Sequence, residues 1–286
     1  MIYLNGQWQS VETAQIAVLD RGFLFGDGIY EVIPVYSRHP FRLDEHLGRL
    51  EASLASVRLT NPHPRETWRE LVLEAISRHS FDDQSVYLQV TRGAGPNRDF
   101  PFPTSAQPSV FIYPMPLTTP SAETKAKGVS AITKADIRWL RCDIKAIALL
   151  ANVLLRNEAL AAGCAESVLL RDGMLTEGAA SNIFVVKDGL LLAPPKSHLM
   201  LSGITYDLVL ELAKQHGVPH EIRPVSEAEI RTADELWMTS STKEVLAITT
   251  LDGFPVGTGR PGPMNAQMDA YYQTYKDSVL RQGGDT

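Results

Sequence analysis

The 286-residue sequence contains only two cysteines, Cys142 and Cys164, and no second pair of cysteines at metal-binding spacing. A disulfide framework and a cysteine-based metal site are therefore not expected, and we predict no bound metal. Both cysteines are predicted to be reduced thiols in the core, as is usual in the cytoplasm.

Long apolar runs are also missing. The longest, residues 146–155, is interrupted by Asn152 and is shorter than the roughly 20 residues that a helix needs to cross a bilayer. The N-terminus has neither a basic start nor the apolar stretch of a secretion signal. We therefore expect a cytoplasmic protein without a membrane partner.

The sequence has no excess of basic residues. Its formal net charge is −6 and its pI is about 5.7. Binding to a nucleic-acid backbone requires a basic face, so we expect no nucleic-acid partner. The hydrophobic share of 44% and the charged share of 21% are typical of a globular protein with one large or two medium domains.

The first half of the chain is predicted to be α+β. One helix is expected to start near Asp44, because leucines recur on one face at helical spacing, and a second is expected to begin at Pro64. The alternating apolar segments predict strands at residues 2–4, 32–36, 86–91 and 110–113.

The segment around residues 114–121 is rich in proline and threonine, so we place an interdomain linker at 115–121. The predicted domains are 1–114 and 122–286. In the second domain, Asp172-Gly173 and Asp188-Gly189 predict two hairpins. Helices are predicted at 146–162 and 204–216, each followed by a glycine.

Lys145 and Glu177 form a pair of residues that suits one cofactor. A lysine in a setting that disfavours its ammonium form can make an imine with an aldehyde. A glutamate in a glycine- and serine-rich turn can keep a pyridine nitrogen protonated, which makes the ring an electron acceptor. Together they are the minimum set for pyridoxal phosphate.

A phosphate group needs positive charge and hydrogen-bond donors, and three places could supply them. Residues 202–205 are predicted at a helix start, where backbone N–H groups point outward. Residues 239–242 form a hydroxyl cluster after an apolar strand pattern, and Arg49 can bind phosphate oxygens with two nitrogens.

Two blocks of sequence carry a family resemblance. Residues 136–145, Asp-Ile-Arg-Trp-Leu-Arg-Cys-Asp-Ile-Lys, are followed about thirty residues later by Thr-Glu-Gly-Ala-Ala-Ser-Asn at 176–182. This pattern resembles the fold type IV pyridoxal phosphate enzymes. A third block, residues 20–32, with Tyr-Glu-Val and then Val35-Tyr36, is most similar to their D-amino-acid aminotransferase branch.

The resemblance implies a small α/β N-terminal domain, a larger pseudo-barrel C-terminal domain and pyridoxal 5'-phosphate as cofactor. It implies Lys145 and Glu177 as catalytic residues. The cofactor-binding residues that it implies are Arg49, Lys145, Glu177, Ser181, Asn182, Gly203, Ile204, Thr205, Ser240, Ser241 and Thr242. The substrate-binding residues that it implies are Tyr30, Val32, Tyr87, Arg98 and Ala180.

The substrate carboxylate is expected at Arg98, with Tyr30 as a second donor. In the resembled branch the loop reads Arg-x-His-x-Phe-Pro, whereas Phe100 stands here where histidine is expected. Phenylalanine cannot donate a hydrogen bond to a carboxylate. An alternative interpretation is that Arg98 only braces its proline-rich loop against Asp99.

The sequence therefore predicts a transaminase that exchanges an amino group between a D-amino acid, such as D-alanine or D-glutamate, and a 2-keto acid. It is expected to be a homodimer with its active site at the subunit and domain interface. The alternatives are a branched-chain L-amino-acid aminotransferase, a lyase similar to aminodeoxychorismate lyase, and a non-catalytic dimeric protein with the same fold.

Overall fold

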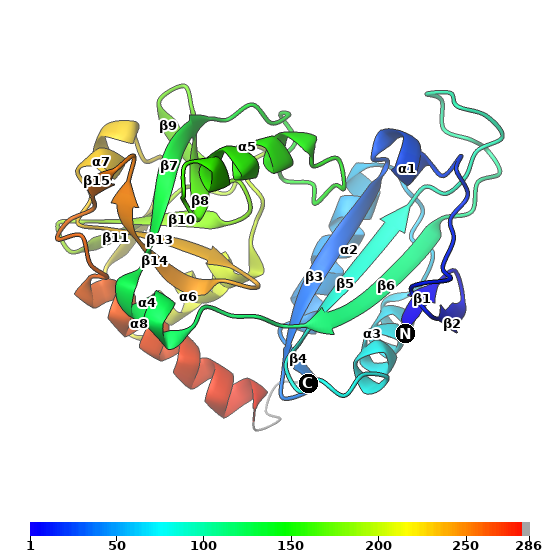
Figure 1. The fold of residues 1–286 in the computed structure, drawn as a ribbon, viewed down its shortest axis with the longest axis horizontal. Helices are drawn as coiled ribbons and strands as arrows, with labels where there is room; N and C mark the ends of the chain where they lie inside the picture. Colours follow the sequence, from blue (N-terminus) through cyan, green and yellow to red (C-terminus); the bar gives the residue numbers. More distant parts are fainter. Residues whose placement is uncertain (282–286) are drawn as a thin grey trace. The chain divides into compact units, whose positions relative to one another are not determined.

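The computed structural model describes residues 1–281, which divide into two compact units. The first comprises Met1–Leu117, Ile144–Leu149 and the described residues from Ser278. The second comprises Thr118–Asp143 and Leu150–Asp277. Both units combine helices with a sheet, so the α+β prediction is confirmed (Figure 1).

The first unit is built on a six-stranded sheet in the order β2-β1-β6-β5-β3-β4, in which the paired strands are antiparallel. Apolar side chains alternate along its long strands β3 and β5, so one face is buried and the other carries half-buried side chains. Its strands are β1 (Ile2–Leu4), β2 (Gln7–Gln9), β3 (Gly28–Tyr36), β4 (His39–Pro40), β5 (Gln84–Thr91) and β6 (Ser109–Pro116).

Two helices, α2 (Leu43–Ser56) and α3 (Arg65–Ser77), cover the buried face of this sheet (Figure 1). Leu47, Leu50 and Trp68 are fully buried there, as the helical spacing of the apolar residues predicts. Helix α3 begins one residue after the predicted Pro64, which is its N-cap. Helix α2 begins at Leu43 and places Asp44 in its first turn. The short helix α1 (Arg21–Phe25) precedes β3.

Strand β6 extends through Pro114 to Pro116, beyond the predicted strand at 110–113 and into the predicted linker. The reason is their position along the strand. The pairing of β1 with β6 runs only to Tyr3 and Ile112, so both prolines lie beyond it. Their missing N–H groups therefore cost no hydrogen bond to β1.

Residues 146–149 are not helical, which corrects the predicted helix start. Helix α5 spans Leu150–Ala161, and the preceding residues run alongside β3 instead. Ala146 forms a bridge with Ile29, and the Ile147 N–H donates to the Gly28 carbonyl over 3.0 Å. This pairing brings the segment that contains Lys145 into the first unit.

The second unit contains a nine-stranded mixed sheet in the order β12-β11-β10-β13-β14-β7-β8-β9, with β15 added on β14. Only three residues separate the edge strand β9 from β10, although several other strands lie between them in the sheet. The sheet must therefore curl back on itself. Its strands are β7 (Val129–Ala135), β8 (Glu166–Arg171), β9 (Met174–Gly178), β10 (Asn182–Lys187), β11 (Leu190–Ala193), β12 (His220–Ile222), β13 (Glu235–Ser240), β14 (Glu244–Leu251) and β15 (Phe254–Pro255).

The two predicted Asp-Gly hairpins are confirmed. Asp172 and Gly173 join β8 to β9 with φ values of 51° and 74°, and Asp188 and Gly189 join β10 to β11 with the same values. Positive φ at both turn positions is what a two-residue hairpin needs. The helices of this unit are α4 (Ala122–Lys127), α5, α6 (Ile204–Gln215), α7 (Glu227–Arg231) and α8 (Pro263–Tyr275). The π-helix η1 (Lys276–Leu280) begins in this unit and ends in the first.

Both cysteines are free, as predicted, but only Cys142 is buried, whereas Cys164 is half-buried at the end of α5. Among residues 1–281, no helix is long and apolar enough to cross a membrane. The same residues contain no cluster of three or more His, Cys, Asp and Glu side chains that could hold a metal ion.

Gly93 offers a test of the packing that starts the Arg98 loop. Its φ is +81°, and a Cβ atom there would lie 1.8 Å from the Gln107 carbonyl oxygen. Gly173 has a similar φ of +74°, with nothing within 4 Å of the added atom. Gly173→Ala should cost about 1 kcal/mol of unfolding free energy, and Gly93→Ala about 2 kcal/mol more. Equal losses in urea-induced unfolding would contradict the contact at Gln107.

Candidate active site

Lys145 lies beside strand β3 in the first unit. Its carbonyl accepts a hydrogen bond from the Tyr30 N–H over 3.0 Å, and its Nζ lies 4.4 Å from the centre of the Tyr30 ring. The residue follows an irregular segment of the chain. The main-chain bond fixes the lysine against the aromatic side chain, so the amine occupies a defined, half-buried position.

The predicted substrate residues Tyr30, Val32 and Tyr87 share one face of the first sheet. In the register of β3 and β5, Tyr30 is opposite Gln89 and Val32 is opposite Tyr87. The Tyr87 hydroxyl donates to Oε1 of Gln89 over 2.6 Å, and the rings of Tyr30 and Tyr87 lie 5.7 Å apart. Burial raises the pKa of Tyr87 to about 12, so its hydroxyl stays a donor at neutral pH. The structure thus brings these three residues and Lys145 together.

The opposite face of β3 carries a buried ion pair. Arg49 Nε and Nη2 donate to the two carboxylate oxygens of Glu31 over 2.8 and 2.7 Å, and His46 Nδ1 lies 2.8 Å from Glu31. Burial disfavours the charge of Glu31, but Arg49 and His46 outweigh it and hold the Glu31 pKa well below its usual range. Arg49, predicted to bind phosphate, is therefore already oriented by a carboxylate from the strand that carries Tyr30.

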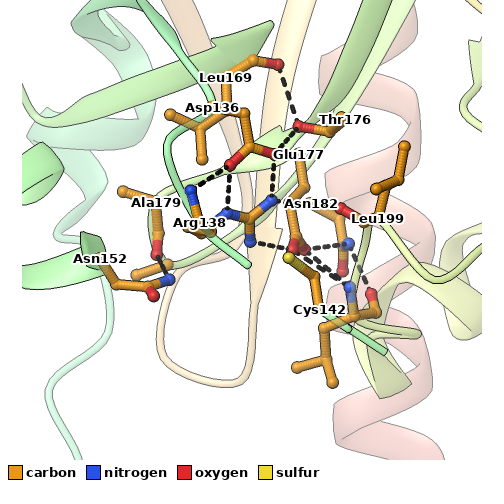
Figure 2. Close-up of polar contacts among 12 residues, drawn as sticks. Asp136, Arg138, Cys142, Asn152, Leu169, Thr176, Glu177, Ala179, Asn182 and Leu199 are labelled. Carbon is orange, nitrogen blue, oxygen red and sulfur yellow. Dashed lines mark hydrogen bonds and ion pairs between the residues drawn. The ribbon is translucent and has the colours of Figure 1, made fainter. Parts of the chain in front are cut away.

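Glu177 is the centre of a buried polar network in the second unit. Arg138 lies between two carboxylates, because one Nη donates to Glu177 while Nε and the other Nη donate to Asp136 over 2.9 Å each (Figure 2). Asp136 also accepts from the Thr176 hydroxyl and pairs with Arg171. Two arginines and two carboxylates balance in charge, which makes their burial tolerable.

The Glu177 carboxylate is held from several sides. The Leu201 N–H donates to it over 3.1 Å, and Nδ2 of Asn182 donates over 3.2 Å. Burial raises the pKa of Glu177 to about 7, against the opposing effect of Arg138. A cationic nitrogen beside this carboxylate would favour its ionised form, which is the partner that a pyridine ring requires.

The turn between β9 and β10 is organised by Glu166. This buried carboxylate accepts hydrogen bonds from the N–H groups of Ala179 and Ala180 over 3.2 and 3.4 Å, and from the Ser181 hydroxyl over 2.8 Å. Predicted substrate residue Ala180 is exposed at the tip of this turn. Ser181, predicted to contact the cofactor, has its hydroxyl hydrogen directed at Glu166.

The predicted phosphate residues of the second unit lie close together. Gly203 caps helix α6 without a side-chain hydrogen bond, and a Cβ atom there would lie 2.1 Å from Asn182 Oδ1. Asn182 is opposite Thr239 in the pairing of β10 with β13. The hydroxyls of Thr205 and Thr239 are buried and, among residues 1–281, have no hydrogen-bond partner. Ile204 is buried in the first turn of α6, and Ser240, Ser241 and Thr242 lie half-buried where β13 turns into β14.

These observations fit pyridoxal phosphate. Buried hydroxyls seldom lack a partner, so Thr205 and Thr239 point to an acceptor that the chain itself does not supply. The N-terminus of a twelve-residue helix, with a glycine that allows close approach, suits a phosphate. Glu177 lies on the same unit and suits the ring nitrogen, while Lys145 and Arg49 belong to the first unit.

Several site residues were not identified from the sequence. Arg138 belongs to the block that ends at Lys145, but its partner Glu177 is 39 residues away. Gln89 could have been found, because it lies two residues after Tyr87 on the same face of a strand. Arg98, which the sequence did identify, is exposed on a loop of the first unit, where its guanidinium contacts aromatic rings.

Comparisons with known proteins agree on one family. Residues 28–251 match the family model described as amino-transferase class IV. The chain is 37% identical, over all of its length and 99% of the relative, to a D-alanine aminotransferase of Bacillus licheniformis.

Solved structures give the same result. The chain is similar to the branched-chain amino acid aminotransferase of Escherichia coli, with a TM-score of 0.90, 26% identity, and coverage of 100% of this chain and 95% of that one. A branched-chain amino acid aminotransferase with pyridoxamine 5'-phosphate, from the organism abbreviated T.th., gives a TM-score of 0.89 and 27% identity, with coverage of 99% and 94%. A third such enzyme, from the archaeon Thermoproteus uzoniensis with norvaline, gives 0.86 and 27%, with coverage of 99% and 95%.

The raised pKa of Glu177 predicts a pH effect on the stability of the cofactor-free protein. Because the folded state binds a proton between pH 4.5 and about 7 that the unfolded state releases, this group's contribution falls as the pH rises through that range. Between pH 5 and 8 the wild-type protein should therefore lose up to about 3 kcal/mol of unfolding free energy that the Glu177→Gln variant does not lose. Urea unfolding at several pH values measures this. The exposed-site variant Glu123→Gln is the control, and a Glu177→Gln curve parallel to wild type would refute the shift.

Proposed function

Because the chain belongs to the amino-transferase class IV family, we propose that it transfers the amino group of a D-amino acid to a 2-keto acid. The family has the fold type IV architecture and depends on pyridoxal phosphate, as expected from the sequence. The observation that carries the choice of a D-amino acid is the full-length similarity to a D-alanine aminotransferase. D-Alanine is accordingly our first candidate substrate, with a 2-keto acid as acceptor.

Bound pyridoxal phosphate supplies an aldehyde carbon that exchanges amines and a ring that accepts electrons. We assign Lys145 as the amine that holds the aldehyde and, once released, as the base that moves the α-proton of the substrate. The main-chain bond from Tyr30 supports this role, because it limits the positions that the Lys145 side chain can reach.

Glu177 is the residue that we assign to the ring nitrogen. Its carboxylate keeps that nitrogen protonated, and Arg138 compensates its charge while Asn182 and the Leu201 N–H fix its orientation. The N-terminus of α6 and the hydroxyls of Thr205 and Thr239 hold the phosphate. We assign Ser240, Ser241, Thr242 and Arg49 to the same group.

The functional form that we propose is a homodimer in the cytoplasm. Helix α5 exposes Leu150, Val153 and Leu154, whose side chains are 73%, 50% and 50% exposed and share one helix face. Apolar stripes of this kind commonly pack against another chain. The free thiols Cys142 and Cys164 are consistent with the reducing conditions of the cytoplasm.

A half-reaction with a panel of amino acids tests the function. The purified protein loaded with pyridoxal phosphate should show a visible absorption band that D-alanine or D-glutamate converts to that of pyridoxamine phosphate, whereas L-leucine leaves it unchanged. Lys145→Ala should lack the lysine-dependent band. Conversion by L-leucine or L-isoleucine alone would instead identify a branched-chain aminotransferase, which the structural similarity to such enzymes makes the second candidate.

Substitutions on α5 test the dimer. Leu154→Glu should lower the sedimentation coefficient from that of a dimer to that of a monomer, because a buried unpaired carboxylate at a chain contact is costly. Leu73→Glu, at another exposed leucine on a helix, is the control and should leave the dimer intact. A dimer that tolerates Leu154→Glu would exclude this helix face from the contact.

A further inference from the structure

The guanidinium of Arg98 lies against two phenylalanine rings that also contact each other. Its central carbon is 5.1 Å from the ring centre of Phe25 and 5.6 Å from that of Phe100, and the two ring centres are 5.6 Å apart. Stacking on an aromatic face is a favourable arrangement for an arginine, and it leaves the N–H groups at the edge of the guanidinium plane available to an anion.

The loop that carries Arg98 is held by a second arginine. Arg21 is buried, and its Nη atoms donate to the carbonyl oxygens of Asp99 and Phe100 over 2.6 and 3.1 Å, with Pro101 at 3.4 Å. Its Nε donates to Asp27 over 2.8 Å. One side chain thus fixes three successive peptide groups next to Arg98.

Asp27 connects this support to the sheet. Its carboxylate accepts from Arg21 and from two nitrogens of Arg92, which in turn donates to the carbonyl groups of Val57 and Arg58. Burial disfavours the charge of Asp27, but the two arginines outweigh it and lower the Asp27 pKa. The loop is therefore anchored through charged hydrogen bonds that persist at neutral pH.

Arg98 itself is not held by an acidic neighbour. Asp99 uses Oδ1 to accept the Phe100 N–H over 2.8 Å, and in the part of the chain that the structure describes no carboxylate pairs with Arg98. The alternative that Arg98 braces its loop against Asp99 is therefore not what the geometry shows. The Arg98 guanidinium is thus exposed and forms no ion pair with the described residues.

We propose that Phe100 and Phe25 are positioning residues that hold the Arg98 guanidinium ready for the substrate carboxylate, on a loop fixed by Arg21. This inference rests on the proposed function, because it takes Arg98 as the group that binds the amino acid's carboxylate. Phe100 replaces a hydrogen-bond donor with a stacking surface. Specificity for a carboxylate then comes from one preorganised arginine fork, with Tyr30 as the second donor.

The test uses the protein loaded with pyridoxal phosphate and three variants. Phe100→Leu removes the ring but keeps an apolar side chain, whereas Phe100→Tyr keeps a ring. Phe23→Leu on α1 is the matched control. Phe23 is also exposed, at 69%, and has no ring contact with Arg98 among the described residues. Two measurements are made on each, namely the half-reaction with D-alanine and the dissociation constant of propionate by calorimetry. Isopropylamine, in which a methyl group replaces the carboxylate of alanine, is the second amine.

Phe100→Leu should raise both the half-saturating D-alanine concentration and the propionate dissociation constant about three- to tenfold, with little change in the limiting rate. Phe100→Tyr should restore wild-type values, Phe23→Leu should not differ from wild type, and the reaction with isopropylamine should be unaffected. Unchanged propionate binding in Phe100→Leu, or equal losses for D-alanine and isopropylamine, would overturn the proposal.

The two proposals fail in different ways. A wild-type protein that binds propionate through Arg98 and Phe100 but converts no D-amino acid would contradict the proposed function while supporting the positioning of Arg98. Conversion of D-alanine with no response to Arg98→Ala would contradict the positioning proposal and leave the transaminase intact.

Discussion

The side chain of Arg138 lies between Asp136 and Glu177, and the polar network around Glu177 in the second unit depends on this arrangement. Glu177 is only 5% exposed, and a carboxylate buried to this degree is stable only if cations and N–H groups surround it. Arg138, Asn182 and the Leu201 N–H meet that need for Glu177 and fix where it points, while Thr176 and Arg171 hold Asp136 on the other side of Arg138. The orientation of the group assigned to the ring nitrogen is thus a result of electrostatic compensation.

The same constraint operates in the first unit. Glu31 is fully buried and takes Arg49 and His46, while Asp27 takes Arg21 and Arg92. Compensating buried charge therefore also positions functional groups, at Arg49 through Glu31 and at the Arg98 loop through Asp27 and Arg21.

Local features of the fold were predictable from the sequence, and contacts between distant residues were not. The turns at Asp172-Gly173 and Asp188-Gly189 were found because residue type alone determines where positive φ is tolerated. The helix start at residue 146 was wrong, because backbone pairing with β3 outweighs the helical tendency of alanine and leucine. Arg21 could not be recognised, since the carbonyl groups that it holds are 78 to 80 residues away.

The Glu166 carboxylate has a further consequence for the turn between β9 and β10. It uses the N–H groups of Ala179 and Ala180 and the hydroxyl hydrogen of Ser181, which would otherwise attract an anion. Because these donors are already in use, the turn between β9 and β10 offers none of them to an anion that approaches the second unit.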